Sequence, residues 1–569
     1  MKKRKTSRNK DRGAILFKRT FKSYSPRERW ISVLCLFIFL LSGWKGVTGN
    51  WKGRTLTAAV TGGHNYNEGL VGEILRLNPV YADLNSVDRD ITSLIFEGLA
   101  KYDPKQQKVI DHIGTHLLDE TQTVYTFQIN EGITWHDGEP VTVEDVYFTY
   151  HDVIQHPEFE NPILKSNFEG VEIELTDEET VTFTLNEPNS FFFTQLTIGL
   201  LPQHILQDVE VGELDTHEFN QYPIGNGPYQ ASKAYDRNMD DSTEIGLTYY
   251  NDYWKDEKPD ITAINFFAFP TYEELKKARG QLHGMAHIQK FRLENLTDER
   301  FNENQYFLPQ YTALFLETNN QEIVKKETRL GLQKAIDKQA IIEKIGYDRV
   351  IDTPLLELDQ EDWITETNLE EAAGSLFDAG WSLDEETNTR VSEDGEEVLA
   401  LRLVRRSYPN NERQEETTQT TAEMIQEQLQ AVGVTVNLQS YEDDQFQRVI
   451  QERDYDLLLY GQNLGYNLDT YSFWHSSQAD NGLNLSNYGN AKADFYIEAI
   501  RTSFNDEKDQ KTAYLQSLAT LIKEDIPAVF LYTPTYYFLT DERIEGIFTN
   551  YLLLPHDRFA NILDWTINK

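Results

Sequence analysis

The pair His136 and Asp137, within Trp135–Pro140, invites a chemical interpretation, because an imidazole beside a carboxylate could transfer protons or bind a metal ion. A metal site needs three or four converging ligands, and no other histidine stands three or four residues from His136. Asp137-Gly138 is typical of a turn. We therefore interpret the pair as a turn that orients Trp135, and we predict no metal site.

The sequence lacks the other common signatures of catalysis. It has no Gly-x-Ser-x-Gly elbow, and its one cysteine, Cys35, lies in an apolar segment, which excludes thiol catalysis and an internal disulfide. The segment Gly225–Pro228 lacks the Lys-Ser/Thr of a phosphate-binding loop, so we interpret it as an elbow. We predict that the protein is not an enzyme and needs no cofactor.

Hydrophobic periodicity predicts the elements that position these residues. Tyr125, Phe127 and Ile129 alternate with polar residues, which indicates a half-buried strand. Thr142, with Asp145 three residues later, predicts a capped helix. In the second half, strands and helices are predicted in alternation at Leu399–Leu403, Gln414–Val432, Val434–Leu438, Asp443–Gln451 and Asp456–Tyr460. This β-α-β-α-β order predicts a parallel sheet with crossover helices.

Several segments resemble, in the same order, the hallmark segments of bacterial extracellular solute-binding proteins of family 5, which bind peptides, nickel chelates and some sugars for ABC importers. They are Leu77–Pro79, Ile95–Leu99, Trp135–Pro140, Glu144–Val146, Pro223–Tyr229, Asn251–Trp254, Arg329–Ile342, Tyr455–Gly461 and Asn487–Asn490. The resemblance implies an α/β, two-lobe periplasmic-binding-protein type II fold. Lobe 1 would comprise residues 55–308 and 530–569, with an extra subdomain at 86–215, and lobe 2 would comprise 309–529.

The resemblance also makes Leu459–Ser477 the leading candidate for ligand contact, because the corresponding strand end and loop line the cleft in the family. Ligands of parallel sheets bind beyond the carboxyl ends of the strands, which agrees with this position. The aspartate that pairs with a peptide's amino group in the peptide-binding members corresponds to a position near Gly465, and Asp469 is close by. The candidate contacts are Gln462, Asn463, Tyr466, Asn467, Asp469, Tyr471 and Trp474. A packed hinge loop is the alternative interpretation.

Three further candidates follow from the same resemblance. Asp83 and Asn85 lie in the loop Tyr81–Ser86, which would face the cleft from lobe 1. Tyr311 begins a predicted hinge strand, Tyr311–Glu317, and could also contact the ligand.

The N-terminus predicts a membrane anchor. Residues 1–29 form a basic tail, and Trp30–Trp44 is apolar and free of charge. At about 1.5 Å per residue this run spans roughly 22 Å, so flanking Arg and Lys must extend the span to about residues 30–47 across a core of about 30 Å. A cleaved secretory signal is the alternative. Either interpretation places residues 55–569 in the periplasm or at the cell surface.

Length and charge complete the prediction. A chain of 569 residues needs more than one core, and its net charge of −40 disfavours binding to nucleic acid. We predict a monomeric, membrane-anchored solute-binding protein that delivers a peptide-like solute to the permease and ATPase of an ABC importer. The alternatives are a cell-surface sensor or receptor with the same fold and, third, an extracellular hydrolase.

Overall fold

The computed structural model describes residues 64–238, 242–255, 258–347, 349–358, 363–409, 412–466, 468–480, 482–504 and 508–568. All of them belong to one of two units of the chain, Ala58–Lys569. The predicted basic tail and membrane anchor lie outside the described residues. Within the described ranges, no helix is long and apolar enough to cross a membrane.

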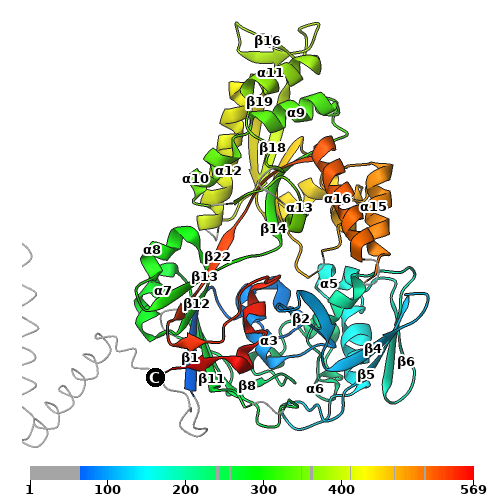
Figure 1. Ribbon diagram of the computed structural model, residues 1–569, viewed down its shortest axis with the longest axis vertical. Helices are drawn as coiled ribbons and strands as arrows, with labels where there is room; N and C mark the ends of the chain where they lie inside the picture. Colours follow the sequence, from blue (N-terminus) through cyan, green and yellow to red (C-terminus); the bar gives the residue numbers. More distant parts are fainter. Residues whose placement is uncertain are drawn as a thin grey trace, which may run out of the picture. The chain divides into compact units, whose positions relative to one another are not determined.

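Two large sheets organise the chain (Figure 1). The first has the strand order β13-β22-β12-β1-β11-β10-β8, with β9 paired to β10. Strand β1 runs parallel to β11 and β12, and the other pairs are antiparallel. The strands are β1 (His64–Val71), β8 (Tyr229–Ala231), β9 (Asp236–Arg237), β10 (Thr243–Tyr249), β11 (Ile261–Phe269), β12 (Gly284–Gln289), β13 (Phe301–Phe307) and β22 (Thr535–Asp541).

The second sheet has the order β15-β21-β14-β20-β18-β19. Its strands are β14 (Gln310–Leu316), β15 (Arg349–Val350), β18 (Ala400–Arg406), β19 (Thr435–Tyr441), β20 (Leu457–Asn463) and β21 (Ala528–Thr533). Strand β18 runs parallel to both β19 and β20. Helices α12 (Glu412–Ala431) and α13 (Asp443–Glu452) connect these strands, so the predicted β-α-β-α-β unit is confirmed.

Helices cover both faces of the second sheet (Figure 1). Alternate residues of β14 enter different cores, with Leu314 on one face and Phe315 on the other, as the period of a strand requires. One face packs against α9 (Lys326–Ala335), α10 (Lys338–Ile345), α11 (Leu369–Asp378) and α12, and the other against α13, α15 (Ala491–Arg501) and α16 (Lys508–Asp525). We call the part built on this sheet lobe 2, and the part built on the first sheet lobe 1.

A smaller antiparallel sheet, β4-β5-β7-β6, forms an extra subdomain beside lobe 1. Its strands are β4 (Gly114–Leu118), β5 (Val124–Ile129), β6 (Glu172–Leu175) and β7 (Thr180–Thr184). The predicted capped helix is present as α4 (Val143–Tyr147), in which Thr142 and Asp145 form a capping box. It continues as a π-helix over Phe148–Ile154.

Three of the segments that carry the family resemblance, Ile95–Leu99, Pro223–Tyr229 and Asn251–Trp254, meet at Glu97, which is buried. The hydroxyl of Tyr253 and Nε1 of Trp254 donate to its two carboxylate oxygens at 2.6 and 3.0 Å, and Nε2 of His112 lies 2.8 Å away. The backbone N–H of Glu97 donates to Oδ1 of Asn226 at 2.8 Å. These segments therefore build a structural junction.

His136 belongs to the same junction. Its ring bonds to the backbone N–H of Gly225 and lies 3.0 Å from the carbonyl of Gly227. A Cβ at Gly225 would come within 2.0 Å of the Ile95 carbonyl, so the elbow needs glycine for close backbone approach. The structural interpretation of His136 agrees with this geometry.

Candidate functional site

The loop that follows β20 begins beside one of the two places where the chain crosses between the sheets. One crossing is Pro309, between β13 and β14, and the other is Pro534, between β21 and β22. The backbone N–H of Leu464 donates to the carbonyl of Pro309 at 2.8 Å. The predicted ligand loop is thus attached directly to one crossing.

Three of the predicted contact residues lie inside lobe 2. Tyr311 is 1% exposed, Gln462 6% and Trp474 1%. The hydroxyl of Tyr311 donates to Oε1 of Gln462, and burial raises the pKa of this tyrosine. Trp474, in the short helix α14 (Tyr471–Trp474), has its ring 6.1 Å from Phe315 and 5.7 Å from Phe530. These buried surroundings agree with the interpretation of the segment as a packed hinge loop.

Tyr466 instead reaches lobe 1. Its hydroxyl donates to Oδ1 of Asp557 and lies 3.0 Å from Nε2 of His556, while its ring lies 5.6 Å from that of Tyr102. Burial raises the pKa of Asp557 to about 6 and lowers that of His556 to about 3. At neutral pH the imidazole is therefore uncharged and the carboxylate mostly ionised.

The hydrogen bonds of Tyr466 also fix the tautomer of His556. The single phenolic proton is given to the Asp557 carboxylate, so Nε2 of His556 must donate to the phenolic oxygen. Nδ1 of His556 is then an acceptor, and this buried atom has no hydrogen-bond partner within the described part of the chain. A buried acceptor without a partner next to both lobes could receive an N–H group.

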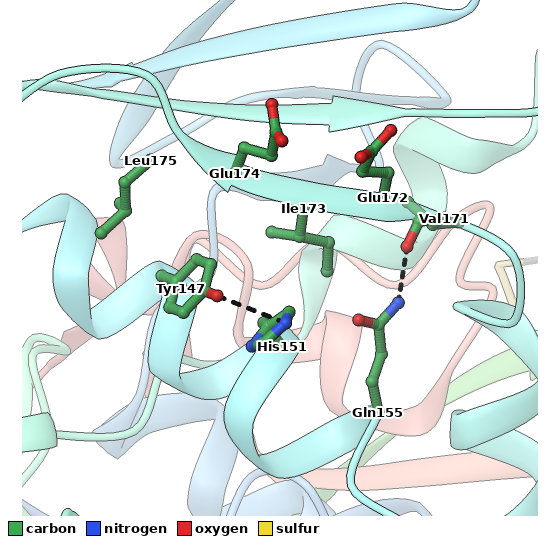
Figure 2. Close-up of a pocket in the computed structure, with 8 residues that line it drawn as sticks. All are labelled: Tyr147, His151, Gln155, Val171, Glu172, Ile173, Glu174 and Leu175. Atoms are coloured by element: carbon green, nitrogen blue, oxygen red, sulfur yellow. Dashed lines mark hydrogen bonds between the residues drawn. The ribbon is translucent and has the colours of Figure 1, made fainter.

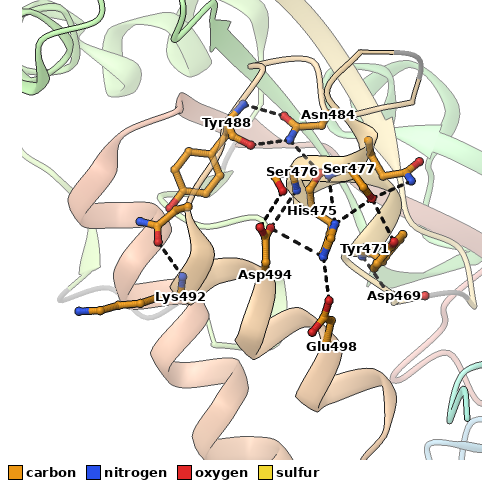
Figure 3. Close-up of polar contacts among 12 residues, drawn as sticks. Asp469, Tyr471, His475, Ser476, Ser477, Asn484, Tyr488, Lys492, Asp494 and Glu498 are labelled. Carbon is orange, nitrogen blue, oxygen red and sulfur yellow. Dashed lines mark hydrogen bonds and ion pairs between the residues drawn. The ribbon is translucent and has the colours of Figure 1, made fainter. Parts of the chain in front are cut away.

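Asp469 has a cationic neighbour in its own lobe. Its Oδ2 lies 3.0 Å from Nε of Arg501. Its Oδ1 accepts a hydrogen bond from the backbone N–H of Tyr471 at 3.0 Å, as Figure 3 shows. Burial raises the pKa of Asp469, and Arg501 opposes this effect. Asn463 is exposed and accepts the N–H of Gly465 at 3.1 Å. Asn467 lies outside the described residues.

The two candidates in lobe 1 lie around the start of helix α3 (Ser86–Ile95). Asn85 caps this helix, since its Oδ1 accepts the N–H of Val87 and its Nδ2 donates to the carbonyl of Glu73. Asp83 is exposed and accepts a hydrogen bond from Asn161 at 2.9 Å. Neither side chain has a hydrogen bond to the loop after β20 among the described residues.

Sequence reasoning missed His556 and Asp557, the lobe 1 partners of Tyr466. A buried cluster holds the segment that carries them: Arg558 donates to Glu68 and, at 2.6 Å, to Asp90. The only sequence signal was a triplet of titratable residues, His556–Arg558, inside the otherwise apolar run Leu552–Phe559. Tyr466 and Asp557 are 91 residues apart, so the pairing could not be read from local pattern.

A serine, a histidine and a carboxylate stand in line near the same loop (Figure 3). Oγ of Ser477 lies 2.8 Å from Nδ1 of His475, whose Nε2 lies 3.3 Å from Glu498. However, Nδ1 also accepts the backbone N–H of Ser477 at 3.1 Å, so His475 caps the short turn Ser476–Gln478. We interpret this set as a capping network, because its base is already engaged by the backbone of the nucleophile.

A groove of about 600 Å³ lies within the extra subdomain (Figure 2). It is bordered by β6, the end of α4 and the π-helix, and the ring centres of Tyr147 and His151 lie 4.3 Å apart in a stacked arrangement. Nε2 of Gln155 donates to the carbonyl of Val171 at 2.7 Å and closes one end. The groove involves one subdomain only. Within the described ranges, no group of His, Cys, Asp or Glu could hold a metal ion.

Comparisons with known proteins agree with this architecture. The family model for bacterial extracellular solute-binding proteins, family 5 Middle, matches residues 116–484. The oligopeptide-binding protein AppA of Bacillus subtilis is 25% identical over 571 residues, which cover 95% of this chain and 98% of that protein. The dipeptide-binding protein of Pseudomonas aeruginosa is 23% identical over 493 residues, which cover 81% of this chain and 88% of that protein.

Solved structures show the same fold. The structure of Bacillus subtilis AppA in complex with a nonapeptide matches with a TM-score of 0.67 and 23% identity, covering 89% of this chain and 99% of that one. NikZ from Campylobacter jejuni in complex with Ni(L-His) matches with a TM-score of 0.66 and 22% identity, covering 88% and 99%. The predicted two-lobe type II fold is confirmed. The chain belongs to the bacterial extracellular solute-binding proteins of family 5.

Proposed function

We propose that this protein captures a peptide-like solute between its two lobes and delivers it to an ABC importer. The observation that carries the proposal is the loop after β20, which starts at the Pro309 crossing and reaches lobe 1 through Tyr466. A solute that contacts this loop and lobe 1 together would favour the closed lobes, because only that state offers both sets of contacts. The relatives named as oligopeptide- and dipeptide-binding proteins support a peptide-like solute.

Within this proposal, the solute contacts divide by chemistry. Tyr466 and the exposed Asn463 are the best-placed predicted contacts, and Asp83 contributes from lobe 1. Because Asp469 already has Arg501 beside it, an N–H of the solute would more readily meet Nδ1 of His556. Tyr311, Gln462, Asn85 and Trp474 would support the site from behind.

The location is also a proposal. The basic residues 1–29 and the apolar residues 30–47 favour a single membrane-spanning anchor that holds the monomer near the importer's permease and ATPase, with the body in the periplasm or at the cell surface. The intact mass of protein extracted from membranes should correspond to a chain that begins at or near Met1 without lipid. A chain that begins near Asn50, or a diacylglyceryl adduct, would contradict the anchor.

The test of solute capture is a panel of oligopeptides, sugars and metal chelates applied to the full-length protein in detergent. The right solute should raise the melting temperature through linkage and reduce the radius of gyration in small-angle scattering. Native mass spectrometry of protein purified without refolding would identify a solute that copurifies. If the oligopeptides leave both properties unchanged while another class changes them, the peptide-like assignment is wrong.

A further inference from the structure

A loop of the extra subdomain contacts lobe 2 at a place remote in sequence from the two crossings. The backbone N–H of Ser190 donates to the carbonyl of Arg501, the last residue of α15, at 2.7 Å. Nζ of Lys511, in α16, donates to Oγ of Ser190 at 2.8 Å and lies 4.2 Å from the ring centre of Phe191. This loop thus donates a backbone hydrogen bond, accepts a charge-assisted hydrogen bond and makes a cation–π contact.

Both sides of this contact are well supported. In the extra subdomain, the carbonyl of Asn189 accepts the hydroxyl of Tyr125 at 3.3 Å, and Phe192 is buried. Phe191 points the other way and packs against the core of lobe 2 formed by α13, α15 and α16. Adjacent phenylalanines therefore join two separate cores, so the lobes cannot part here without exposing Phe191.

Arg501 connects this contact to the loop after β20. Its guanidinium lies 3.0 Å from Asp469 and 4.2 Å from the ring centre of Tyr471, while its carbonyl accepts the N–H of Ser190. Asp469 in turn fixes the start of α14 through the N–H of Tyr471. The backbone and the side chain of one residue therefore join the extra subdomain to the loop that carries the solute-contact candidates.

We propose that Ser190, Phe191, Lys511 and the carbonyl of Arg501 form a clasp that holds the extra subdomain on lobe 2 in the closed protein, with Arg501 positioning the solute-contacting loop. The inference rests on the proposed solute capture and adds a regulatory role for the extra subdomain. Contacts made only in the closed state lower its free energy whatever the solute is, so the clasp slows solute release. A shift of the loop after β20 would move Arg501 and so disturb the hydrogen bond between its carbonyl and the N–H of Ser190.

Hydrogen exchange tests the clasp, first without solute and then with the oligopeptide mixture. In the full-length protein, the amide of Ser190 should be protected, and Lys511→Met and Phe191→Ala should each speed its exchange about three- to tenfold. Lys511→Met keeps the aliphatic stem of the side chain, so it should leave α16 folded. The matched controls are Lys492→Ala and Phe377→Ala, whose side chains are exposed on α15 and α11. Rapid exchange in the wild-type protein both without and with the oligopeptide mixture, or exchange unchanged in both variants, overturns the clasp.

A double-mutant cycle tests the role of Arg501. If Asp469 acts on the clasp through Arg501, Asp469→Asn should also speed exchange at Ser190, and its effect should not add to that of Lys511→Met. Arg501→Lys, which keeps the charge, should restore most of the protection lost in Arg501→Gln. Arg501 does not couple the loop to the clasp if the effects of Asp469→Asn and Lys511→Met add. The same conclusion follows if Ser190 exchanges equally fast in Arg501→Lys and Arg501→Gln.

Release of bound oligopeptide supplies the last readout. In stopped-flow measurements with the oligopeptide mixture, Lys511→Met and Phe191→Ala should speed release about three- to tenfold, with the melting temperature close to that of the wild type. Unchanged release rates would mean that the clasp does not act on solute capture. If the wild-type protein binds no oligopeptide, the proposed function fails, while exchange at Ser190 still decides whether the clasp exists.

Discussion

Three of the segments that resemble the family build a junction, and Glu97 is its centre. Burial acts to raise the pKa of this carboxyl, but His112, Lys101 and the donor of Trp254 outweigh burial and hold the pKa below its usual range. Glu97 therefore stays ionised at neutral pH. The hydroxyl of Tyr253 needs the same acceptor. A charge that satisfies several donors from distant segments is costly to remove.

Replacing Glu97 by glutamine should therefore lower the free energy of unfolding by about 2–4 kcal/mol, because an amide cannot accept from all these donors. A carboxyl with a lowered pKa stabilises the fold above its unfolded pKa of about 4.5, and this contribution is lost as the pH falls toward the folded pKa of about 2. Urea unfolding should thus show that the difference in unfolding free energy between variant and wild type is constant above about pH 5 and narrows as the pH falls from 5 toward 3.

The exposed Glu131 offers a matched control, since Glu131→Gln should change the free energy of unfolding by less than about 0.5 kcal/mol. A difference for Glu97→Gln that stays constant from pH 5 to pH 3 would show that the charge of Glu97 is not what stabilises the junction.

At the scale of elements, the local sequence pattern was enough to predict a helix or strand where the signal is a hydrophobic period or a helix cap. Alternation predicted β5, the Thr142–Asp145 spacing predicted α4, and apolar runs in alternation with an amphipathic pattern predicted β18 to β20. Gly433 ends its helix with a positive φ of 89°, as glycine after a helix should. These signals depend on neighbours in the chain, so a sequence contains them.

The candidate site was harder to predict because burial and pairing are long-range. Nothing local distinguishes Tyr466, which reaches His556 and Asp557, from Tyr311, which is enclosed in lobe 2. Likewise, the position of Arg501 beside Asp469 depends on how α15 packs against the loop. Polar and aromatic composition marked the loop as a whole but could not assign its side chains to the inside or the outside.

Trp474 provides the test at this scale. Its indole is 1% exposed and lies against Phe315 and Phe530, so Trp474→Ala should cost about 3–5 kcal/mol of unfolding free energy and lower the melting temperature clearly. Trp474→Phe should recover a large part of this loss by filling the space. A solute-stacking role predicts the opposite pattern, in which affinity for solute falls and the melting temperature hardly changes.

For the whole molecule, the two crossings between the sheets form a short ribbon that carries a proline in each strand. Phe307 pairs with Thr535 on the lobe 1 side, and Thr312 pairs with Tyr532 on the lobe 2 side. Pro309 and Pro534 lie between these pairs. Proline fixes its own φ and restricts the residue before it. The ribbon can therefore bend over only a narrow range, which limits how far the lobes can separate.

The last prediction follows from this restriction. The double variant Pro309→Ala/Pro534→Ala should widen the distribution of distances between spin labels at the exposed positions Leu117 and Phe377 in the solute-free protein, measured after Cys35→Ser. It should lose about 1–2 kcal/mol of stability, because alanine frees the unfolded chain. Solute affinity should fall about three- to tenfold, because fewer molecules occupy the binding-competent arrangement.

Pro157→Ala, in an exposed turn of the extra subdomain, should change neither the distances nor the affinity. A double variant with the same distance distribution as wild type would show that the lobes move about some other part of the chain, and a wider distribution with unchanged affinity would show that the prolines do not prepare the protein for its solute.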